Sequence, residues 1–380
     1  MSPPPLPESI RLLDSLQDIA PDAWDSLHGG NPTLAHAFLD SLHRSGCASP
    51  RTGWTPQFLT LWERDALKGA VPLYAKTHSF GEYVFDWAWA EAYERHGLAY
   101  YPKLLAAVPF TPATGPRLMA ATDAARRALA GALLELAGNS SVSSLHVLFP
   151  AETDAVALRA AGFMERAGVQ FHWRNPGYAT FDDFLAALAQ EKRKKIRQER
   201  RKVADAGVRL RRATGREATE ADWDFFTACY LRTYRAHRST PYLSREFFGM
   251  LAARMPDNVL LVIAERDGKP VAAALDLFSP SALYGRYWGA VEFVPGLHFE
   301  ACYYQAIEFA IERGIALIEG GAQGEHKHAR GFLPERTRSF HWLAHPAFAR
   351  AVDDYLAREG AGICAYVDEL NDRSPFRNAR

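Results

Sequence analysis

Cysteine is scarce in this sequence: the 380 residues include only four, and no two of them form a CxxC pair. This scarcity argues against a cysteine-based metal cluster or a disulfide framework, and it favours a reducing, cytoplasmic setting. Because a free cysteine usually behaves as a small buried side chain, we interpret Cys302 as a core residue of a helix.

An excess of charge is missing too, since 44 Lys and Arg residues balance 44 Asp and Glu residues. A dedicated nucleic-acid binder would be expected to carry an overall basic field, so any phosphate contact must come from a local feature. No apolar run approaches the ~20 residues that cross a bilayer, and the N-terminus lacks the features of a signal peptide. We therefore expect a cytoplasmic protein without integral membrane contact.

Common catalytic motifs are absent as well. The sequence has no P-loop, GxSxG elbow, HExxH motif or dinucleotide-binding fingerprint, which argues against hydrolases and nucleotide kinases. Glu325, His326 and His328 stand close together, but a zinc site would need a fourth ligand at the usual spacing. We predict no metal ion and no tightly bound cofactor.

The chain is long enough for two domains, because it exceeds the ~250–300 residues at which a single core stops growing. Residues 1–9 are a proline-rich lead that we expect to be disordered. Residues 10–175 and 208–380 each predict a strand, two helices, a meander of strands and further alternating elements, and residues 176–207 predict a basic connector helix. This order indicates an α/β (α+β) fold with two mixed, twisted sheets flanked by helices.

Local patterns predict several individual elements. Asp267-Gly268 between two apolar runs predicts a hairpin turn, and residues 299–313 predict an amphipathic helix. Residues 181–205 predict one continuous helix. Residues 76–116 are rich in aromatic side chains and interrupted by Pro and Gly, so we interpret them as an irregular cleft wall.

Several short segments resemble one known family. The segments are Asn31-Pro32 with Ala37-Phe38-Leu39, Gly69 to Tyr74, Gly81 to Trp87, Lys192 to Arg197, Tyr284 to Gly289, His298 to Glu300, and Gly320 to Lys327. They resemble the FemAB-like proteins labelled as peptidoglycan biosynthesis or recognition proteins, within the GNAT superfamily of N-acyltransferases. The resemblance runs from about residue 30 to about residue 375. It implies two tandem GNAT-like domains, the first on the acceptor side.

The resemblance also implies amide-bond formation. In Fem ligases an aminoacyl-tRNA gives its amino acid to an amine of a peptidoglycan precursor, and in simpler GNAT enzymes the donor is acyl-CoA. The GNAT donor signature places Gly-x-Gly or Gly-x-Ala at a helix start, where backbone N–H groups hold the pyrophosphate. The matching stretch here, Gly289 to His298, departs from that signature, and Glu292 would repel a pyrophosphate. The departure favours aminoacyl-tRNA or another activated acyl donor as co-substrate.

A glycine-rich loop after an expected strand concentrates polar residues. Glu319, Gln323, Glu325, His326 and Lys327 fall within nine residues. Glycines let the backbone approach a ligand, and loops at the carboxyl ends of strands are where α/β folds bind ligands. Acyl transfer to an amine needs a base and a group that stabilises the oxyanion. We predict that His326 or a carboxylate is the base and that Lys327 stabilises charge; the alternative is a solvated polar turn.

Further residues are candidate substrate contacts. Asp86 lies among aromatics, a mixture suited to an amine, although it could instead be a turn residue in an aromatic core. Tyr284, Arg286 and Trp288 alternate along an expected strand, which predicts that they share one face. The candidates are Asp86, Trp87, Tyr284, Arg286, Trp288, His298, Glu300 and Tyr304.

Two alternatives concern the helix that begins near Phe299. Tyr304 lies off its apolar stripe and is expected to face the cleft, whereas Tyr303 is expected in the core. Glu300 either contacts substrate or stabilises the start of the helix.

A basic run occupies residues 191–202, with eight Lys or Arg residues and two Glu. Such a helix would present positive charge on most faces and could contact the phosphates of a tRNA donor or an anionic precursor. The alternative is a solvated connector, and no RNA-binding module motif predicts sequence-specific reading. The predicted phosphate contacts are Lys192, Arg193, Lys194, Lys195 and Arg197.

Together these patterns predict an acyltransferase that transfers an aminoacyl or acyl group to an amine-bearing acceptor, by resemblance a cell-wall peptide precursor. One alternative is an acyl-CoA-dependent N-acetyltransferase of small molecules. Another is a non-catalytic protein that recognises cell-wall peptide or nucleic acid.

Overall fold

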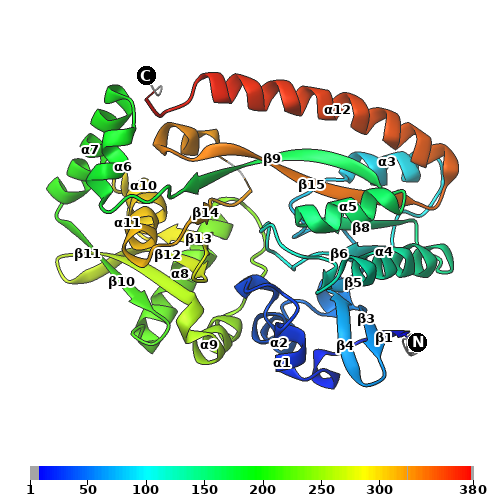
Figure 1. Cartoon of the computed structure of the whole chain (residues 1–380). Coiled ribbons are helices and arrows are strands. Elements are labelled where there is room, and N and C mark those ends of the chain that lie inside the picture. Colours follow the sequence, from blue (N-terminus) through cyan, green and yellow to red (C-terminus); the bar gives the residue numbers. More distant parts are fainter. Residues whose placement is uncertain (1–7, 323, 378–380) are drawn as a thin grey trace, which may run out of the picture. The chain divides into compact units, whose positions relative to one another are not determined.

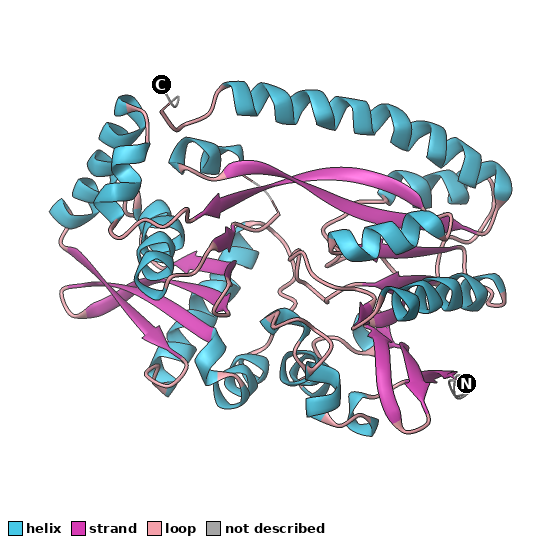
Figure 2. Ribbon diagram, viewed as in Figure 1, coloured by secondary structure: helices cyan, strands magenta, loops and turns pink. Residues whose placement is uncertain are grey.

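The computed structural model describes residues 8–322 and 324–377 (Figure 1). It divides into two compact units, and Figure 2 shows that both combine helices and strands. The expected α/β class is therefore confirmed. The units are Met1–Gly168 with Arg336–Ala365 (unit 1) and Val169–Glu335 with Tyr366–Arg380 (unit 2).

This division differs from the boundaries expected at residues 175 and 208. Three elements begin in one unit and end in the other: β9 (Met164–Arg174), β15 (Leu333–Leu343) and α12 (Pro346–Asp372). A late part of the chain thus completes unit 1. Local sequence patterns could not reveal this, because they do not record which core a strand joins.

Unit 1 contains two sheets. In one, the strands follow the order β2-β5-β6-β8-β15, and in the other the order β1-β3-β4-β7. Only β6 and β8 pair in parallel, among the strand pairs described in this unit. Its further elements are β1 (Glu8–Leu13), α1 (Pro21–Asp25), α2 (His36–Arg44), β2 (Trp54–Pro56), β3 (Phe58–Glu63), β4 (Ala66–Val71), β5 (Leu73–Lys76), α3 (Trp87–Arg95), β6 (Lys103–Ala106), β7 (Met119–Ala120), α4 (Asp123–Gly138), β8 (Ser144–Leu148) and α5 (Glu152–Ala160).

The main core of unit 1 lies between its strands and the helices α4 and α5. Leu129 and Leu133 of α4 pack with Val147 of β8 and Leu158 of α5, and all four side chains are buried. Thr122 caps α4 by accepting a hydrogen bond from the Ala125 N–H, which offsets one unpaired donor at the helix start. Residues 76–116, which were expected to be irregular, contain the helix α3 and the strand β6.

Unit 2 contains one sheet, in the order β10-β11-β12-β13-β14-β9. The hairpin between β11 and β12 turns at Asp267 and Gly268, whose φ angles of 51° and 72° fit the predicted tight turn. The further elements are α6 (Phe181–Ala187), α7 (Gln190–Asp205), β10 (Val208–Thr214), α8 (Glu220–Ala236), α9 (Arg245–Arg254), β11 (Val259–Arg266), β12 (Lys269–Phe278), β13 (Ala282–Ala290), α10 (Leu297–Phe299), α11 (Gln305–Arg313), β14 (Leu317–Glu319) and a 3-10 turn (Glu325–Arg330).

Two expected helices are interrupted. The predicted helix over residues 181–205 breaks at Leu188, whose ψ of 155° is extended, so α6 and α7 are separate. The helix before Gly314 contains a π-helical turn, Glu300–Tyr304. Such turns insert one residue into a helix, shift the facing of the residues near them, and often occur at functional sites.

Both units share one arrangement. In each, a strand and a later strand pair in parallel, β6 with β8 and β13 with β14, and a helix lies between them in the chain. The repeated arrangement agrees with the expectation of two tandem domains with a similar order of elements. No helix among residues 8–322 and 324–377 is long and apolar enough to cross a membrane.

Gly289 on β13 allows the close approach of α8. A Cβ atom there would lie 2.1 Å from the Cys229 carbonyl oxygen, so Gly289→Ala should destabilise the fold by about 3 kcal/mol. Gly249 of α9 is the matched control, because a Cβ atom there meets only the end of the flexible Arg245 side chain. Gly249→Ala should be neutral or stabilise by up to about 1 kcal/mol. Urea unfolding followed by circular dichroism would test this, and equal effects would contradict it.

Candidate active site

In unit 2 the parallel pairing of strands β13 and β14 stops just before a glycine on each side. The last pair is Tyr284 with Glu319, and the residues that follow are Gly285 and Gly320. The ladder between β12 and β13 is irregular at the same place, because Arg286 is skipped in the register. Bulges and strand ends of this kind re-aim side chains and free backbone groups, and they often border functional sites.

Lys327 reaches this strand end from the following loop. Its Nζ donates a hydrogen bond to the Gly320 carbonyl oxygen and lies 3.4 Å from that of Gly321. The side chain is buried, and burial lowers the pKa of the ammonium group to about 8. At neutral pH Lys327 therefore remains mostly a cation, and a partly desolvated cation can strongly stabilise a developing negative charge.

His326 lies next to Lys327 but is exposed. Its Nε2 is 2.9 Å from the Tyr303 hydroxyl oxygen, and its ring also lies close to those of His298 and Phe299. Partial burial, with the charges of Lys327 and its neighbours, lowers the pKa of the imidazole. The ring is then neutral at pH 7 and chemically able to accept a proton.

The two predicted carboxylates of this loop, Glu319 and Glu325, differ in their exposure to solvent. Glu319 is buried at the end of β14, and its backbone pairs with Tyr284 and His172. Glu325 is exposed and forms a hydrogen bond with Tyr366, whose pKa is raised by burial and by this carboxylate. Gln323 lies outside the described residues.

The predicted shared face of β13 was wrong. Leu283 packs into the core with α11, and Trp288 packs against the same core. In a regular strand these two residues, five positions apart, would lie on opposite faces. The extra residue at Arg286 shifts the alternation, so Tyr284 and Trp288 lie on opposite faces. Trp288 joins His298, whose ring it contacts at a centroid distance of 5.5 Å.

The expectation that Tyr304 faces the cleft was also wrong, whereas Tyr303 is buried in the core as expected. Tyr304 is fully buried, and its hydroxyl donates to Glu199 of α7, whereas Tyr303 reaches His326. The π-helical turn supplies the physical reason, because it changes which residues face the core. Glu300 is buried as well and forms a bidentate pair with Arg200, at 3.1 Å for both contacts.

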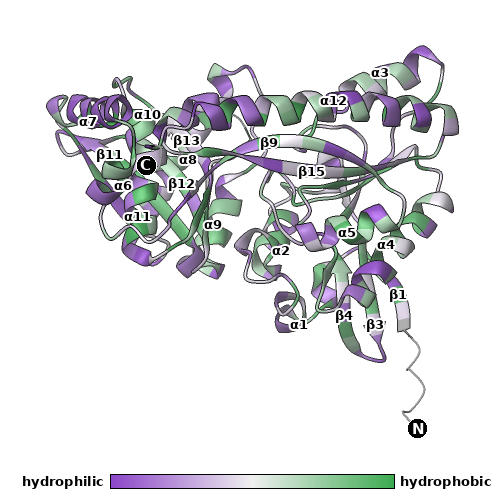
Figure 3. Cartoon of the chain, turned by 45° about the horizontal axis from the view of Figure 1, so that its top comes forward, coloured by the Kyte–Doolittle hydropathy of each residue, from purple (hydrophilic) through white to green (hydrophobic). Residues whose placement is uncertain are grey.

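Helix α7 has one paired face and one basic outer face. Ile196 and Val203 are buried, and Arg200 binds Glu300 and Glu308. Figure 3 colours most of α7 purple, which marks hydrophilic residues. Four cations of this helix are exposed and have no ion-pair partner within the described chain. These exposed cations are Lys194, Lys195, Arg201 and Lys202.

The other predicted phosphate contacts of α7 are partly engaged. Lys192 pairs with Glu191 at 2.8 Å, and Arg197 lies 3.3 Å from Asp182. A cavity of about 410 Å³ opens beside this helix. Its lining residues are Thr180, Phe181, Asp182, Leu185, Arg197, Arg200, Arg201 and Glu308.

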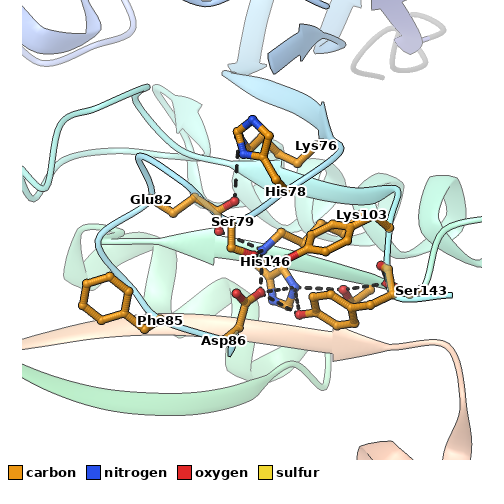
Figure 4. Close-up of polar contacts among 12 residues, drawn as sticks. Lys76, His78, Ser79, Glu82, Phe85, Asp86, Lys103, Ser143 and His146 are labelled. Atoms are coloured by element: carbon orange, nitrogen blue, oxygen red, sulfur yellow. Dashed lines mark hydrogen bonds and ion pairs between the residues drawn. The ribbon is translucent and has the colours of Figure 1, made fainter. Parts of the chain in front are cut away.

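Unit 1 contains a buried group of charges, which we call the Lys103 cluster: Lys76, Ser79, Glu82, Asp86 and Lys103 (Figure 4). The Lys103 Nζ donates to Ser79 Oγ at 2.7 Å, to Glu82 Oε2 at 2.8 Å and to Asp86 Oδ2. Burial lowers the pKa of Lys76 and raises that of Glu82. The Lys103 charge offsets the burial of Asp86, whose pKa is held below its usual value.

The cluster continues through a chain of hydrogen bonds. The Tyr100 hydroxyl donates to Asp86 Oδ2 at 2.6 Å and lies 3.1 Å from His146 Nε2. His146 Nδ1 is 2.8 Å from His341 Nδ1. Burial lowers the pKa of His146 to about 3, so this part of the network is uncharged. Buried polar groups that satisfy one another in this way fix a single arrangement of the backbone.

The segment over the Lys103 cluster alternates between inward polar and outward aromatic side chains. Asp86 and Glu82 point inward, whereas Phe80, Phe85 and Trp87 are exposed. Figure 4 shows Phe85 directed away from the charged groups. Asp86 therefore contacts Lys103 rather than solvent, and its role toward an acceptor stays a prediction, as does that of the exposed Trp87.

Several residues of both groups escaped the sequence analysis. Glu82 and Lys103 carry no local signal, because their pairing joins segments about 20 residues apart. Asp276 did carry one: it is a single acid within the apolar run from Val271 to Phe278 of strand β12. Its neighbour Cys302 was correctly expected on a helix.

Comparisons with known proteins agree with this architecture. The FemAB_like family model, described as peptidoglycan biosynthesis/recognition, matches residues 15–378. A search of curated proteins found no match. Among solved structures, FemX is 12% identical with a TM-score of 0.57, covering 91% of this chain and 100% of FemX.

Two further structures are similar in fold. A conserved protein of unknown function from Bacteroides thetaiotaomicron VPI-5482 is 14% identical with a TM-score of 0.53, covering 88% of this chain and 99% of that one. L-PGS from Bacillus licheniformis is 9% identical with a TM-score of 0.51, covering 89% and 97%. With the family match and the repeated arrangement, the likeness confirms the tandem GNAT-like fold.

The Lys103 cluster generates a stability prediction. Lys103→Met would leave Glu82 and Asp86 buried without their cation, so it should destabilise the protein by about 3–5 kcal/mol. Lys68→Met is the control in the same unit, because Lys68 is exposed and pairs with Glu63 at the surface. It should change stability by less than about 0.5 kcal/mol. Thermal unfolding would measure the stability of both variants. Similar small losses of stability in the two variants would contradict a stabilising role for the Lys103 cluster.

Proposed function

Because the chain belongs to the FemAB-like family, we propose that it is an acyltransferase that transfers an aminoacyl or acyl group to an amine and so forms an amide bond. The observation that carries the proposal is the position of Lys327. It places a buried cation at the glycine-lined end of a parallel strand pair, beside the neutral, exposed His326.

The chemistry requires no covalent enzyme intermediate. The amine nitrogen attacks the acyl carbon, a C–N bond forms, and the carbonyl oxygen transiently takes the electron pair. When the carbonyl re-forms, the bond from the acyl carbon to the donor oxygen or sulfur breaks. The leaving group takes up the proton that the amine loses, so atoms and charge balance.

The two loop residues divide these tasks. Lys327 stabilises the negative charge on the carbonyl oxygen, since its cation is held by backbone carbonyls and is only weakly solvated. His326 accepts the proton from the attacking amine, with Tyr303 orienting its ring. Lys327 and His326 are adjacent in the chain, and the carbonyl oxygen and the amine nitrogen on which they act are both bonded to the acyl carbon in the transition state.

Aminoacyl-tRNA is the donor that we propose. The stretch from Gly289 to His298 lacks a glycine signature for a pyrophosphate, and Glu292 there pairs with Arg266. Gly289 instead admits the backbone of α8. The exposed cations of α7 offer contacts to a phosphate backbone. The family description supports an amine of a cell-wall peptide precursor as acceptor.

Donor binding tests the role of α7. Lys194→Gln with Lys195→Gln should weaken binding of charged tRNA and reduce the slope of log affinity against log salt by about 1.5, because two phosphate contacts are lost. Lys269→Gln with Arg238→Gln is the control, since both residues are exposed cations of unit 2 outside α7. Filter binding over a salt series gives the slopes. Binding of acetyl-CoA without any preference for tRNA would instead favour an acyl-CoA enzyme.

The pH dependence of transfer tests Lys327. Its pKa of about 8 means that the cation is lost as pH rises through 8, so the rate should fall about tenfold per unit above that value. Lys327→Arg should move this alkaline limb to higher pH, because guanidinium stays charged. Lys327→Met should lower the rate about 100-fold at pH 7. Full activity of folded Lys327→Ala and His326→Ala proteins would refute these roles.

A further inference from the structure

Asp276 is a single acidic residue inside the core of unit 2. It lies on β12 between Ala274 and Phe278, two residues to either side, and both belong to the core formed with the π-helical turn and α11. Because side chains of a strand alternate, the Asp276 carboxyl points into that core. The residue is only 2% exposed.

The carboxyl group is not satisfied by this core. Its Oδ2 atom has no hydrogen-bond partner among the described residues. A buried polar group in this state costs stability, and an isolated charge costs far more, so the group stays protonated. Burial accordingly raises the pKa of Asp276 well above its usual value. An apolar side chain would serve the core better, which indicates that packing is not the reason for an acid here.

The position of Asp276 connects it with the proposed active site. It pairs in register with Gly285, the half-buried residue at which β13 and β14 part. A Cβ atom on Gly285 would lie 3.7 Å from Asp276 Oδ1 and 3.6 Å from the Glu319 carbonyl oxygen. The missing side chain therefore leaves the carboxyl next to the end of β14.

Lys327 approaches the same place from the loop. The Cys302 thiol, in the π-helical turn, lies within electrostatic range of both Asp276 and Lys327. Burial is the main cause of the raised pKa of Cys302, so its thiol stays protonated and is not a nucleophile. The end of β13 and β14 thus brings the Lys327 cation and the Asp276 acid close to Gly285 and Cys302, neither of which supplies a reactive group.

We propose that the Asp276 carboxyl, in its neutral form, is a second catalytic group that donates a hydrogen bond to the carbonyl oxygen of the acyl donor, together with Lys327. The ligand class is the carbonyl of an activated acyl ester or thioester. Asp276 keeps its proton throughout, so it changes no bond count in the transfer. A neutral acid in an apolar site is an effective donor to an oxyanion. This inference rests on the proposed acyl transfer.

Three variants test this role. Asp276→Asn keeps a neutral hydrogen-bond donor of the same shape and should transfer within about tenfold of wild type. Asp276→Leu removes the donor and should lose about 100-fold in single-turnover rate, while its melting temperature stays equal or rises. Glu300→Gln is the matched control: its buried carboxylate is paired with Arg200, so the substitution should lower the melting temperature.

Infrared spectroscopy gives a direct readout with a donor labelled with ¹³C at its carbonyl. Bound to wild type or Asp276→Asn, the carbonyl stretch should shift to lower frequency, and the shift should be smaller with Asp276→Leu. Equal shifts or equal rates in wild type, Asp276→Asn and Asp276→Leu would overturn the role of Asp276 and leave the proposed function standing. Equal losses in Asp276→Asn and Asp276→Leu would overturn it as well, and would indicate a base or a structural residue. A wild type that neither binds nor turns over charged tRNA or acetyl-CoA would refute the proposed function together with this inference.

Discussion

A charge removed from water must be compensated, and this constraint separates the two polar groups of the protein. In unit 1 the Lys103 ammonium receives three oxygen partners, two of them carboxylates. In such a group the buried cation is paired directly with buried anions, so removing one partner is costly. In unit 2 the Lys327 ammonium bonds to backbone carbonyls, which stabilise a cation without neutralising it. A group of this second kind retains charge that can act on a substrate.

The same contrast applies to acids. Asp86 is held ionised by Lys103, and Glu300 is paired with Arg200, so both serve to position their elements. Asp276 is buried without such a cation. Unsatisfied buried polar groups are uncommon in folded proteins, and departures from regular packing of this kind concentrate at functional or strained sites. Burial alone is therefore a poor guide to function, whereas the balance between burial and partners is informative.

Helix α7 illustrates how tertiary packing divides a uniform sequence. Its basic run contains eight cations that look alike in one dimension. In the fold, Arg200 turns inward to two acids, Arg197 and Lys192 pair with single acids at the surface, and Lys194 and Lys195 point outward. Within the described chain the outward residues Lys194 and Lys195 have no ion-pair partner, so their charge is open to a phosphate backbone.

Sequence patterns by themselves determined the α/β class, the Asp267-Gly268 hairpin and the glycine-rich loop, because these depend on local periodicity and turn chemistry. They also indicated the family. Only the tertiary structure decided which core β15 joins, that Tyr303 rather than Tyr304 reaches His326, and that Trp288 and Tyr284 face apart. A bulge and a π-helical turn each insert one residue. In a strand this reverses the facing that a regular period predicts, and in a helix it rotates the facing by about 100°. The pairing of Lys103 with Glu82 lay equally beyond local patterns, since it depends on segments that meet only when the sheet forms.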